Sequence, residues 1–323
     1  MQITPIPCLN DNYAYIIEDN NSKKIGVVDP SEASPIISFL KNKNLKLNYI
    51  LNTHHHFDHI GGNEELKKLY NAKVVGFIGD KHRIPGINIT LKDNEKWYFG
   101  NSLIRIFHIP GHTLGHICFF FEEEKIAFTG DTLFSLGCGR IFEVSYKKML
   151  TSLNKIKKLP KNTNIYCGHE YTYKNAEFCM KYDEGNINLK KKFEIIKKLR
   201  SKNLPTIPTS LADELNSNIF LRCDQNDLKN KLKLNYILNT HHHFDHIGGN
   251  VELKKIYNAK VVGFSGDKHR IPGIDIAIKD NEKWIFGNLQ VKILHIPGHT
   301  LGHICFFFEK EKVAFTGDTF FYL

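Results

Sequence analysis

The stretch "NTHHHFDHIGGN" occupies residues 52–63 and recurs, letter for letter, at residues 239–250. Between Thr53 and Ile60 it contains four histidines and one aspartate. Imidazole and carboxylate groups are common ligands of divalent transition metals, and a surface loop without such a role rarely gathers so many of them. The stretch therefore predicts a metal-binding loop, and the sequence contains it twice.

Strand-like runs surround the first copy of this loop, at residues 13–19, 24–30, 47–53, 73–77, 103–109, 116–122 and 125–131. Helical spacing near 32–43 and 62–71 separates some of these runs, and "FEEEKIAF" (121–128) reads as a hairpin. The composition of "KDNEKWYFGN" (92–101) is typical of a turn. A helix near 145–158, a strand over 164–170 and mainly helix to about 203 follow. This order predicts a mixed α/β part that gives way to a smaller helical region.

The candidate metal ligands come after strand-like runs. They are His54, His56, Asp58 and His59 after the run 47–53, His112 after 103–109, Asp131 at the end of 125–131, and His169 near the end of 164–170. Seven ligands are too many for one tetrahedral ion but fit two ions, and the two oxygens of Asp131 suit a bridge. We expect His55 and His116 to support the ligands rather than to bind metal.

The motifs T-H-x-H-x-D-H (53–59), G-H-T (111–113), T-G-D (129–131) and G-H-E (168–170) together resemble the metallo-β-lactamase superfamily. More specifically, "DTLFSLGCGR" (131–140), "CGHEYT" (167–172) and "NIFLR" (218–222) are similar to the glyoxalase II (hydroxyacylglutathione hydrolase) family, over residues 1 to about 227. The resemblance implies an αββα sandwich of catalytic function over residues 1–170, and a helical substrate-binding region over 171–227.

The resemblance also implies a division of the ligands. His54, His56 and His112 would hold one metal, Asp58, His59 and His169 the other, and Asp131 would bridge them, so that Asp58 and Asp131 are the catalytic carboxylates. The cofactors would be two divalent ions, with zinc expected and iron or manganese as alternatives.

The implied reaction is hydrolysis of an S-(2-hydroxyacyl)glutathione, S-D-lactoylglutathione above all, to D-lactate and glutathione. A hydroxide held between the two metals would attack the thioester. Arg140, Tyr171 and Arg222 would bind the glutathione part through its carboxylates. One departure from the family is that Cys223 follows Arg222, where a further basic residue is common. Cys138 lies between two glycines, which suggests a tight turn and no nucleophile.

Two other functions stay open from the sequence alone. A ribonuclease of the same superfamily would suit the formal charge of +10, and a fusion product could bind metal without catalysis. We favour neither, and we expect no nucleic-acid partner because the lysines of 188–203 read as the solvated face of a helix. No apolar run is long enough to span a membrane and no signal segment is evident, so we expect a cytoplasmic protein. The oligomeric state stays open.

Residues 45–134 align without gaps to residues 232–321, and 15 of these 90 positions differ. The segment 228–323 is therefore expected to be a truncated repeat of part of the sandwich. It retains six of the seven ligand positions, as His241, His243, Asp245, His246, His299 and Asp318. It contains no counterpart of His169 or of residues 1–44. We expect this second copy not to complete an active site.

Overall fold

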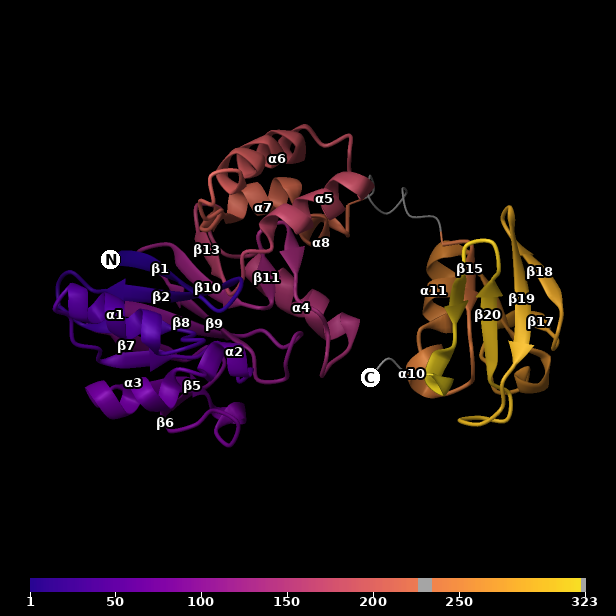
Figure 1. Cartoon of the computed structure of the whole chain (residues 1–323), viewed down its shortest axis with the longest axis horizontal. Coiled ribbons are helices and arrows are strands. Elements are labelled where there is room, and N and C mark those ends of the chain that lie inside the picture. Colours follow the sequence, from indigo (N-terminus) through magenta and orange to yellow (C-terminus); the bar gives the residue numbers. More distant parts are fainter. Residues whose placement is uncertain (226–233, 321–323) are drawn as a thin grey trace. The chain divides into compact units, whose positions relative to one another are not determined.

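The computed structural model describes residues 1–225 and 234–320 and separates the chain into two units (Figure 1). Unit 1 is Met1–Leu228 and unit 2 is Lys229–Leu323. Each unit buries apolar clusters of its own.

The first sheet of unit 1 contains six strands in the order β1-β2-β3-β4-β5-β6. Strands β1 to β3 are antiparallel, whereas β3 to β6 run parallel and connect through helices, as parallel neighbours must. The elements are β1 (Gln2–Cys8), β2 (Asn12–Glu18), β3 (Ile25–Val28), α1 (Ser34–Asn42), β4 (Tyr49–Leu51), α2 (Phe57–Ile60), α3 (Asn63–Tyr70), β5 (Lys73–Phe77), η1 (Ile78–Asp80) and β6 (Ile87–Leu91).

The second sheet of unit 1 has the order β14-β13-β10-β9-β8-β7. Its strands β7 to β10 form an antiparallel meander, and β13 joins β10 in parallel after the helix α4. The elements are β7 (Lys96–Phe99), β8 (Ser102–His108), β9 (Ile117–Phe121), β10 (Ile126–Gly130), α4 (Tyr146–Ile156), β13 (Asn164–Cys167) and β14 (Thr209–Ser210), with the small hairpin β11 (Leu133–Phe134) and β12 (Gly137–Cys138) beside them.

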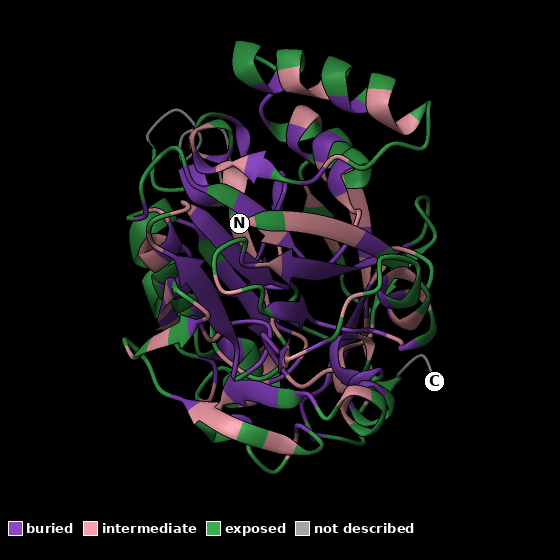
Figure 2. Cartoon of the chain, turned by 90° about the vertical axis from the view of Figure 1, so that its left-hand side faces the viewer, coloured by how far each residue is buried: buried purple, intermediate pink, exposed green. Residues whose placement is uncertain are grey.

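Strand β9 explains how the layers stack. Its alternate residues Ile117, Phe119 and Phe121 belong to the cluster between the two sheets, whereas Cys118 and Phe120 belong to the cluster on the far side of the second sheet, together with α4 residues. Strand β2 divides its side chains in the same way between the central cluster and the cluster that includes α1. Both sheets are therefore covered on both faces, which is the predicted αββα sandwich. Figure 2 shows the mostly buried strands inside helices that expose one face.

The helical region that follows contains α5 (Thr172–Tyr182), α6 (Ile187–Arg200), α7 (Leu211–Ser217) and α8 (Ile219–Arg222). Helices α5 and α6 pack against each other over a small apolar cluster that includes Leu136 of the sandwich. The predicted helical region is thus present.

Unit 2 repeats part of this arrangement. It has a three-stranded sheet β15-β16-β17 and a four-stranded sheet β18-β19-β20-β21. The elements are β15 (Tyr236–Leu238), α10 (Phe244–Ile247), α11 (Asn250–Tyr257), β16 (Lys260–Phe264), η2 (Ser265–Asp267), β17 (Ile274–Ile278), β18 (Lys283–Phe286), β19 (Leu289–His295), β20 (Ile304–Phe308), β21 (Val313–Phe315) and η3 (Gly317–Thr319).

The sheets of unit 2 leave side chains exposed that unit 1 covers. In unit 1, β4 pairs with β3 and β10 pairs with β13, but no strand takes these places among the described residues of unit 2. Phe128 is 1% exposed, whereas the corresponding Phe315 is 53% exposed. Leu66 is fully buried, whereas the corresponding Leu253 is 37% exposed. The described part of this unit therefore has open sheet edges and an incompletely covered core.

The strand predictions for unit 1 were wrong at one position and incomplete at others. The two-residue strands β11, β12 and β14 were not predicted. Residues 96–99, read as part of a turn, form β7, and strands β1 and β6 were not predicted. Strands β1, β6 and β7 lie at the edge of a sheet, where one side of the strand has no neighbour and the side chains are only partly buried. Such strands carry a weak apolar pattern.

Candidate metal centre

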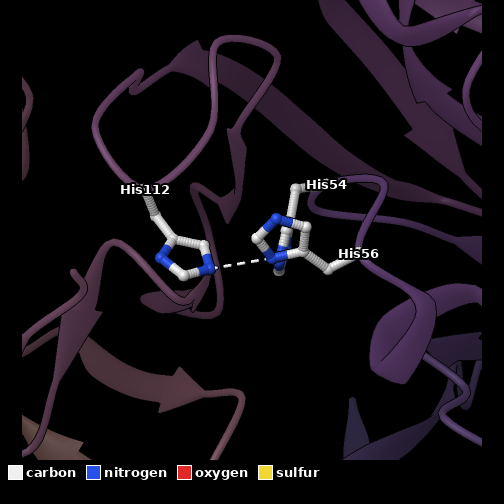
Figure 3. Close-up of side chains that lie close together, drawn as sticks. All are labelled: His54, His56 and His112. Atoms are coloured by element: carbon white, nitrogen blue, oxygen red, sulfur yellow. Dashed lines mark hydrogen bonds between the residues drawn. The ribbon is translucent and has the colours of Figure 1, made fainter. Parts of the chain in front are cut away.

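Three histidines from two loops form the first group of the centre. His54 follows β4, His56 precedes α2, and His112 lies in the loop after β8. Their candidate ligand nitrogens all lie within 4.8 Å of one another. Nε2 of His112 is 2.9 Å from Nδ1 of His56, and the three rings point toward one another (Figure 3).

A second group, Asp58, His59 and His169, combines two residues of α2 with one from the loop after β13. Its candidate ligand atoms also lie within 4.8 Å of one another. Oδ2 of Asp58 is 3.4 Å from Nε2 of His169 and 3.6 Å from Nε2 of His59.

Asp131, directly after β10, lies between the two groups. Its carboxylate oxygens are 3.6 Å from Nε2 of His112, 3.4 Å from Nε2 of His59 and 3.2 Å from Nε2 of His169. The fold thus brings together all seven positions that the sequence singled out, because the loops after β4, β8, β10 and β13 meet at one end of the two sheets.

The buried atoms of this cluster fit a metal ion. Nε2 of His54, Nε2 of His59 and Oδ1 of Asp131 are buried without a hydrogen-bond partner. Buried polar atoms nearly always have a hydrogen-bond partner. Unpaired polar atoms that lie this close together therefore indicate that the site binds a cation. A donor set of imidazole nitrogens and carboxylate oxygens suits a divalent transition metal.

The two groups differ in their proton affinity. Burial lowers the pKa of His54 well below its usual value and that of His56 to about 4, so that both rings are neutral at pH 7. Burial acts in the same direction on His169, but hydrogen bonds to Asp131 and Asp58 and the charge of Asp131 raise its pKa to about 10. We therefore expect metal binding at the second group to displace a proton from His169.

Two carboxylates that the sequence analysis did not single out hold ligand rings in place. Asp11 accepts a hydrogen bond from Nδ1 of His169 at 2.8 Å, and Asp29 accepts one from Nδ1 of His59 at 3.2 Å. Each contact leaves Nε2 of the ring free to face the centre. Asp29 could have been predicted from the sequence, because it directly follows the apolar run of β3, just as the candidate ligands follow their strands. Asp11 carries no such signal.

His55 and His116 take the supporting places expected for them. Nδ1 of His55 contacts Oδ2 of the fully buried Asp80 at 3.1 Å, which directs this ring away from the cluster. The ring of His116 stacks on His54 at 4.6 Å, and its Nε2 accepts a hydrogen bond from the backbone N–H of Asp131 at 3.0 Å.

The predicted substrate residues lie in different surroundings. The Tyr171 ring stacks on His169 at 4.6 Å and lines a cavity of about 670 Å³. Arg140 is exposed, and its carbonyl oxygen accepts a hydrogen bond from Nδ1 of His112 at 2.9 Å. Arg222 is only 8% exposed, and its guanidinium forms an ion pair with Asp183. Tyr171 and Arg140 therefore border the cluster through contacts of their own.

The cavity beside Tyr171 also carries cationic side chains that the sequence analysis did not consider. Its lining consists of Asp11, Glu170, Tyr171, Tyr173, Lys174, Lys197, Arg200 and Ser201. Lys197 and Arg200 lie on the lysine-rich helix that was read as a solvated face. Their position could be known only once the end of α6 was placed beside the loop after β13, where Arg200 lies 3.7 Å from Glu170.

Two protein-family models match this chain. A model described as "Metallo-beta-lactamase superfamily" matches residues 10–86, 98–169 and 226–323. A second, described as "Hydroxyacylglutathione hydrolase C-terminus", matches residues 170–247.

Curated relatives extend this match over most of the chain. A hydroxyacylglutathione hydrolase of Pelagibacter ubique is 55% identical over 233 residues, which are 72% of this chain and 98% of the relative. This chain belongs to the hydroxyacylglutathione hydrolase family. Another hydroxyacylglutathione hydrolase, from Methylococcus capsulatus, is 43% identical over 72% of this chain and 91% of its own length.

A solved structure supports the fold of this hydroxyacylglutathione hydrolase family member. The B3 metallo-β-lactamase BLEG-1 superposes with a TM-score of 0.53 at 23% identity, covering 68% of this chain and 99% of the other. At this identity the likeness concerns the metallo-β-lactamase fold. Among the described residues, none of the helices is both long and apolar enough to cross a membrane.

Proposed function

We propose that this chain hydrolyses S-(2-hydroxyacyl)glutathione thioesters, with S-D-lactoylglutathione as the main substrate, to D-lactate and glutathione. The observation that carries the proposal is the cluster of two ligand groups joined by Asp131, in a chain that is 55% identical to a hydroxyacylglutathione hydrolase. The match of residues 170–247 to that family's C-terminal region disfavours the ribonuclease.

We assign the two ligand groups to two divalent metal ions, with zinc expected and iron or manganese as alternatives. His54, His56 and His112 would hold one ion, Asp58, His59 and His169 the other, and Asp131 would touch both. Such ions supply Lewis acidity and a water molecule of lowered pKa.

The protein residues would prepare the centre for this chemistry. Asp11 and Asp29 orient His169 and His59, and the fixed tautomers present Nε2 toward the centre. Cys138 is no rival nucleophile, because burial raises its pKa to about 12 and keeps the thiol protonated at pH 7. A thiolate leaves without protonation by a strong general acid, so the mechanism requires no further acidic residue.

We assign substrate binding to Arg140, Tyr171 and Arg222. The roles of the two parts of unit 1 follow from this assignment. Residues 1–170 would carry the catalytic centre and 171–227 the contacts to glutathione. We further infer that 228–323 is a partial duplicate of 45–134 without catalytic function. The expected cytoplasmic location stays a prediction.

A direct test is to purify the full chain, determine metal per chain, and follow thiol release from S-D-lactoylglutathione. We expect hydrolysis that a chelator abolishes and that a divalent metal restores. A protein with its metals bound that releases no thiol from this substrate would contradict the proposal.

Removal of residues 228–323 is expected to preserve or improve hydrolysis, because unit 1 contains all seven ligand positions. His243→Ala in the full chain is likewise expected to leave kcat unchanged. The matched variant is His56→Ala, which changes the same position of the identical loop in unit 1 and is expected to abolish activity. Loss of half the activity in His243→Ala would instead indicate a second working site.

Arg222→Ala is expected chiefly to raise KM, because a contact to a remote carboxylate acts equally in the ground state and the transition state. The same change removes the cation from the buried Asp183, which is 2% exposed. Breaking a buried pair in this way costs about 3–5 kcal/mol of folding stability. KM and the unfolding midpoint should therefore be measured together.

Asp183→Asn is the matched control, since it breaks the same ion pair and keeps the guanidinium. An equal rise of KM in this variant would attribute the effect to packing of the helical region. A fall of kcat alone in Arg222→Ala would require Arg222 to lie nearer the chemistry.

A further inference from the structure

Unit 2 contains a histidine cluster that the proposed function does not use. His241, His243 and His299 offer nitrogens that all lie within 4.8 Å of one another. Nε2 of His299 is 2.9 Å from Nδ1 of His243. His241 is fully buried, and its Nε2 has no hydrogen-bond partner. A buried imidazole nitrogen that faces two other imidazoles without a partner indicates a bound cation.

The loop that carries this cluster is held by contacts within unit 2. Nδ1 of His241 lies 3.1 Å from Oγ1 of Thr240, and the His241 ring stacks on His303 at 4.4 Å. His242, between the two ligand candidates, contacts the fully buried Asp267 at 2.9 Å and is not part of the cluster. The rings of His241 and His243 therefore lie close together before any ion binds, which lowers the cost of ordering them.

Asp318 can contribute a fourth ligand, although its loop differs from that of Asp131 in unit 1. Its Oδ2 is 3.4 Å from Nε2 of His299 and 3.8 Å from Nε2 of His241. Strand β21 ends at Phe315, before the short helix η3 that includes Asp318. The side chain of Asp318 is 24% exposed, whereas that of Asp131 is 7% exposed. Asp318 can thus reach the three histidines from a more open position.

The place of a second ion is incomplete in the described part of unit 2. His246 lies 3.6 Å from Asp245 and 3.3 Å from Asp318. Among residues 234–320, no histidine takes the role that His169 has in unit 1, and the side chain of Asp245 is 76% exposed. One ion position is therefore well formed and the other is not.

We propose that unit 2 binds one divalent transition metal through His241, His243, His299 and Asp318, as a mononuclear site separate from the catalytic centre. Three imidazoles and one carboxylate match the ligand number and type that Zn²⁺ prefers. A metal ion that binds the folded form of unit 2, and not its unfolded form, stabilises the folded form by mass action. The ion would thus compensate in part for the open sheet edges of this unit.

The test measures zinc per chain in the full-length protein after equilibration with Zn²⁺ and removal of loosely bound metal. His299→Ala is the variant of choice, because its side chain is 35% exposed and its loss leaves no large cavity. We expect His299→Ala to bind about one zinc fewer than the unchanged chain, with thiol release unaltered. The control His295→Ala is expected to retain all the zinc, since His295 stacks on Phe264 outside the cluster.

The test compares zinc per chain between the unchanged chain and His299→Ala, so its outcome does not depend on how many ions unit 1 holds. Equal zinc content in the unchanged chain and in His299→Ala would overturn the proposal. Hydrogen–deuterium exchange of the unchanged chain gives a second measurement that needs no variant. Peptides that extend to Val251 report on unit 2 alone, because the first copy has Glu64 there. Zn²⁺ should protect them, and identical exchange with and without Zn²⁺ would overturn the proposal.

Discussion

Asp131→Ala is expected to abolish thioester hydrolysis. Among residues 1–225 and 234–320, Asp131 is the one carboxylate within 3.6 Å of ligand candidates from both groups, His112 on one side and His59 and His169 on the other. In the proposed two-metal centre, its removal would take a shared ligand from both ions. Metal catalysis contributes several kcal/mol to lowering the barrier, so we expect the rate to fall by roughly 10³-fold or more. The measurement is kcat/KM for S-D-lactoylglutathione, together with metal per chain.

The repeat in this chain supplies a matched control for Asp131→Ala. Asp318→Ala makes the same substitution at the corresponding position of unit 2, and we expect it to leave hydrolysis unchanged. His169→Ala, which has no counterpart among the described residues of unit 2, should act like Asp131→Ala. Near-normal turnover in either unit 1 variant would refute the two-metal mechanism.

Gly168→Ala is expected to disrupt the same centre without removing any ligand. A Cβ atom at this position would lie 2.4 Å from Oδ1 of Asp131 and 2.6 Å from Cε1 of His59. The backbone cannot easily move away, because its N–H donates to Gly130 and its carbonyl accepts from Tyr13. The two ligand side chains must therefore shift, and a misplacement of about 1 Å at a reacting centre costs about 10²-fold in rate.

The test of Gly168→Ala compares kcat and metal content with those of Gly185→Ala, where a Cβ atom meets nothing within 4 Å. Circular dichroism should show that both variants remain folded. We expect a lowered metal content and a fall in kcat of roughly 10²-fold or more for Gly168→Ala alone. Unchanged kinetics would mean that the loop after β13 accommodates the methyl group.

The sequence alone was sufficient to predict a mixed α/β part and to place its seven candidate ligands together, and the resemblance to the metallo-β-lactamase superfamily implied the sandwich. Strands β2 and β9 are buried on both faces, so their apolar residues form continuous runs that are visible in the sequence. Strands β8 and β10 are both antiparallel to β9, so the residues that follow them gather at the same end of the sheet, which is why His112 and Asp131 meet although 19 positions separate them. The sequence also shows that residues 232–321 resemble residues 45–134, and the interpretation of this segment as a truncated copy stays a prediction.

Only the tertiary structure decided which residues support the ligands and where the glutathione-binding candidates lie. Asp11 contacts His169 across 158 positions of sequence, and Arg222 pairs with Asp183 across 39. Neither pairing has a local pattern, since each depends on the path of the whole chain between the two residues. The edge strands β1, β6 and β7 escaped prediction for a different reason. Each pairs on one side only, with a strand nearby in the sequence, and its partly buried side chains form a weak apolar pattern.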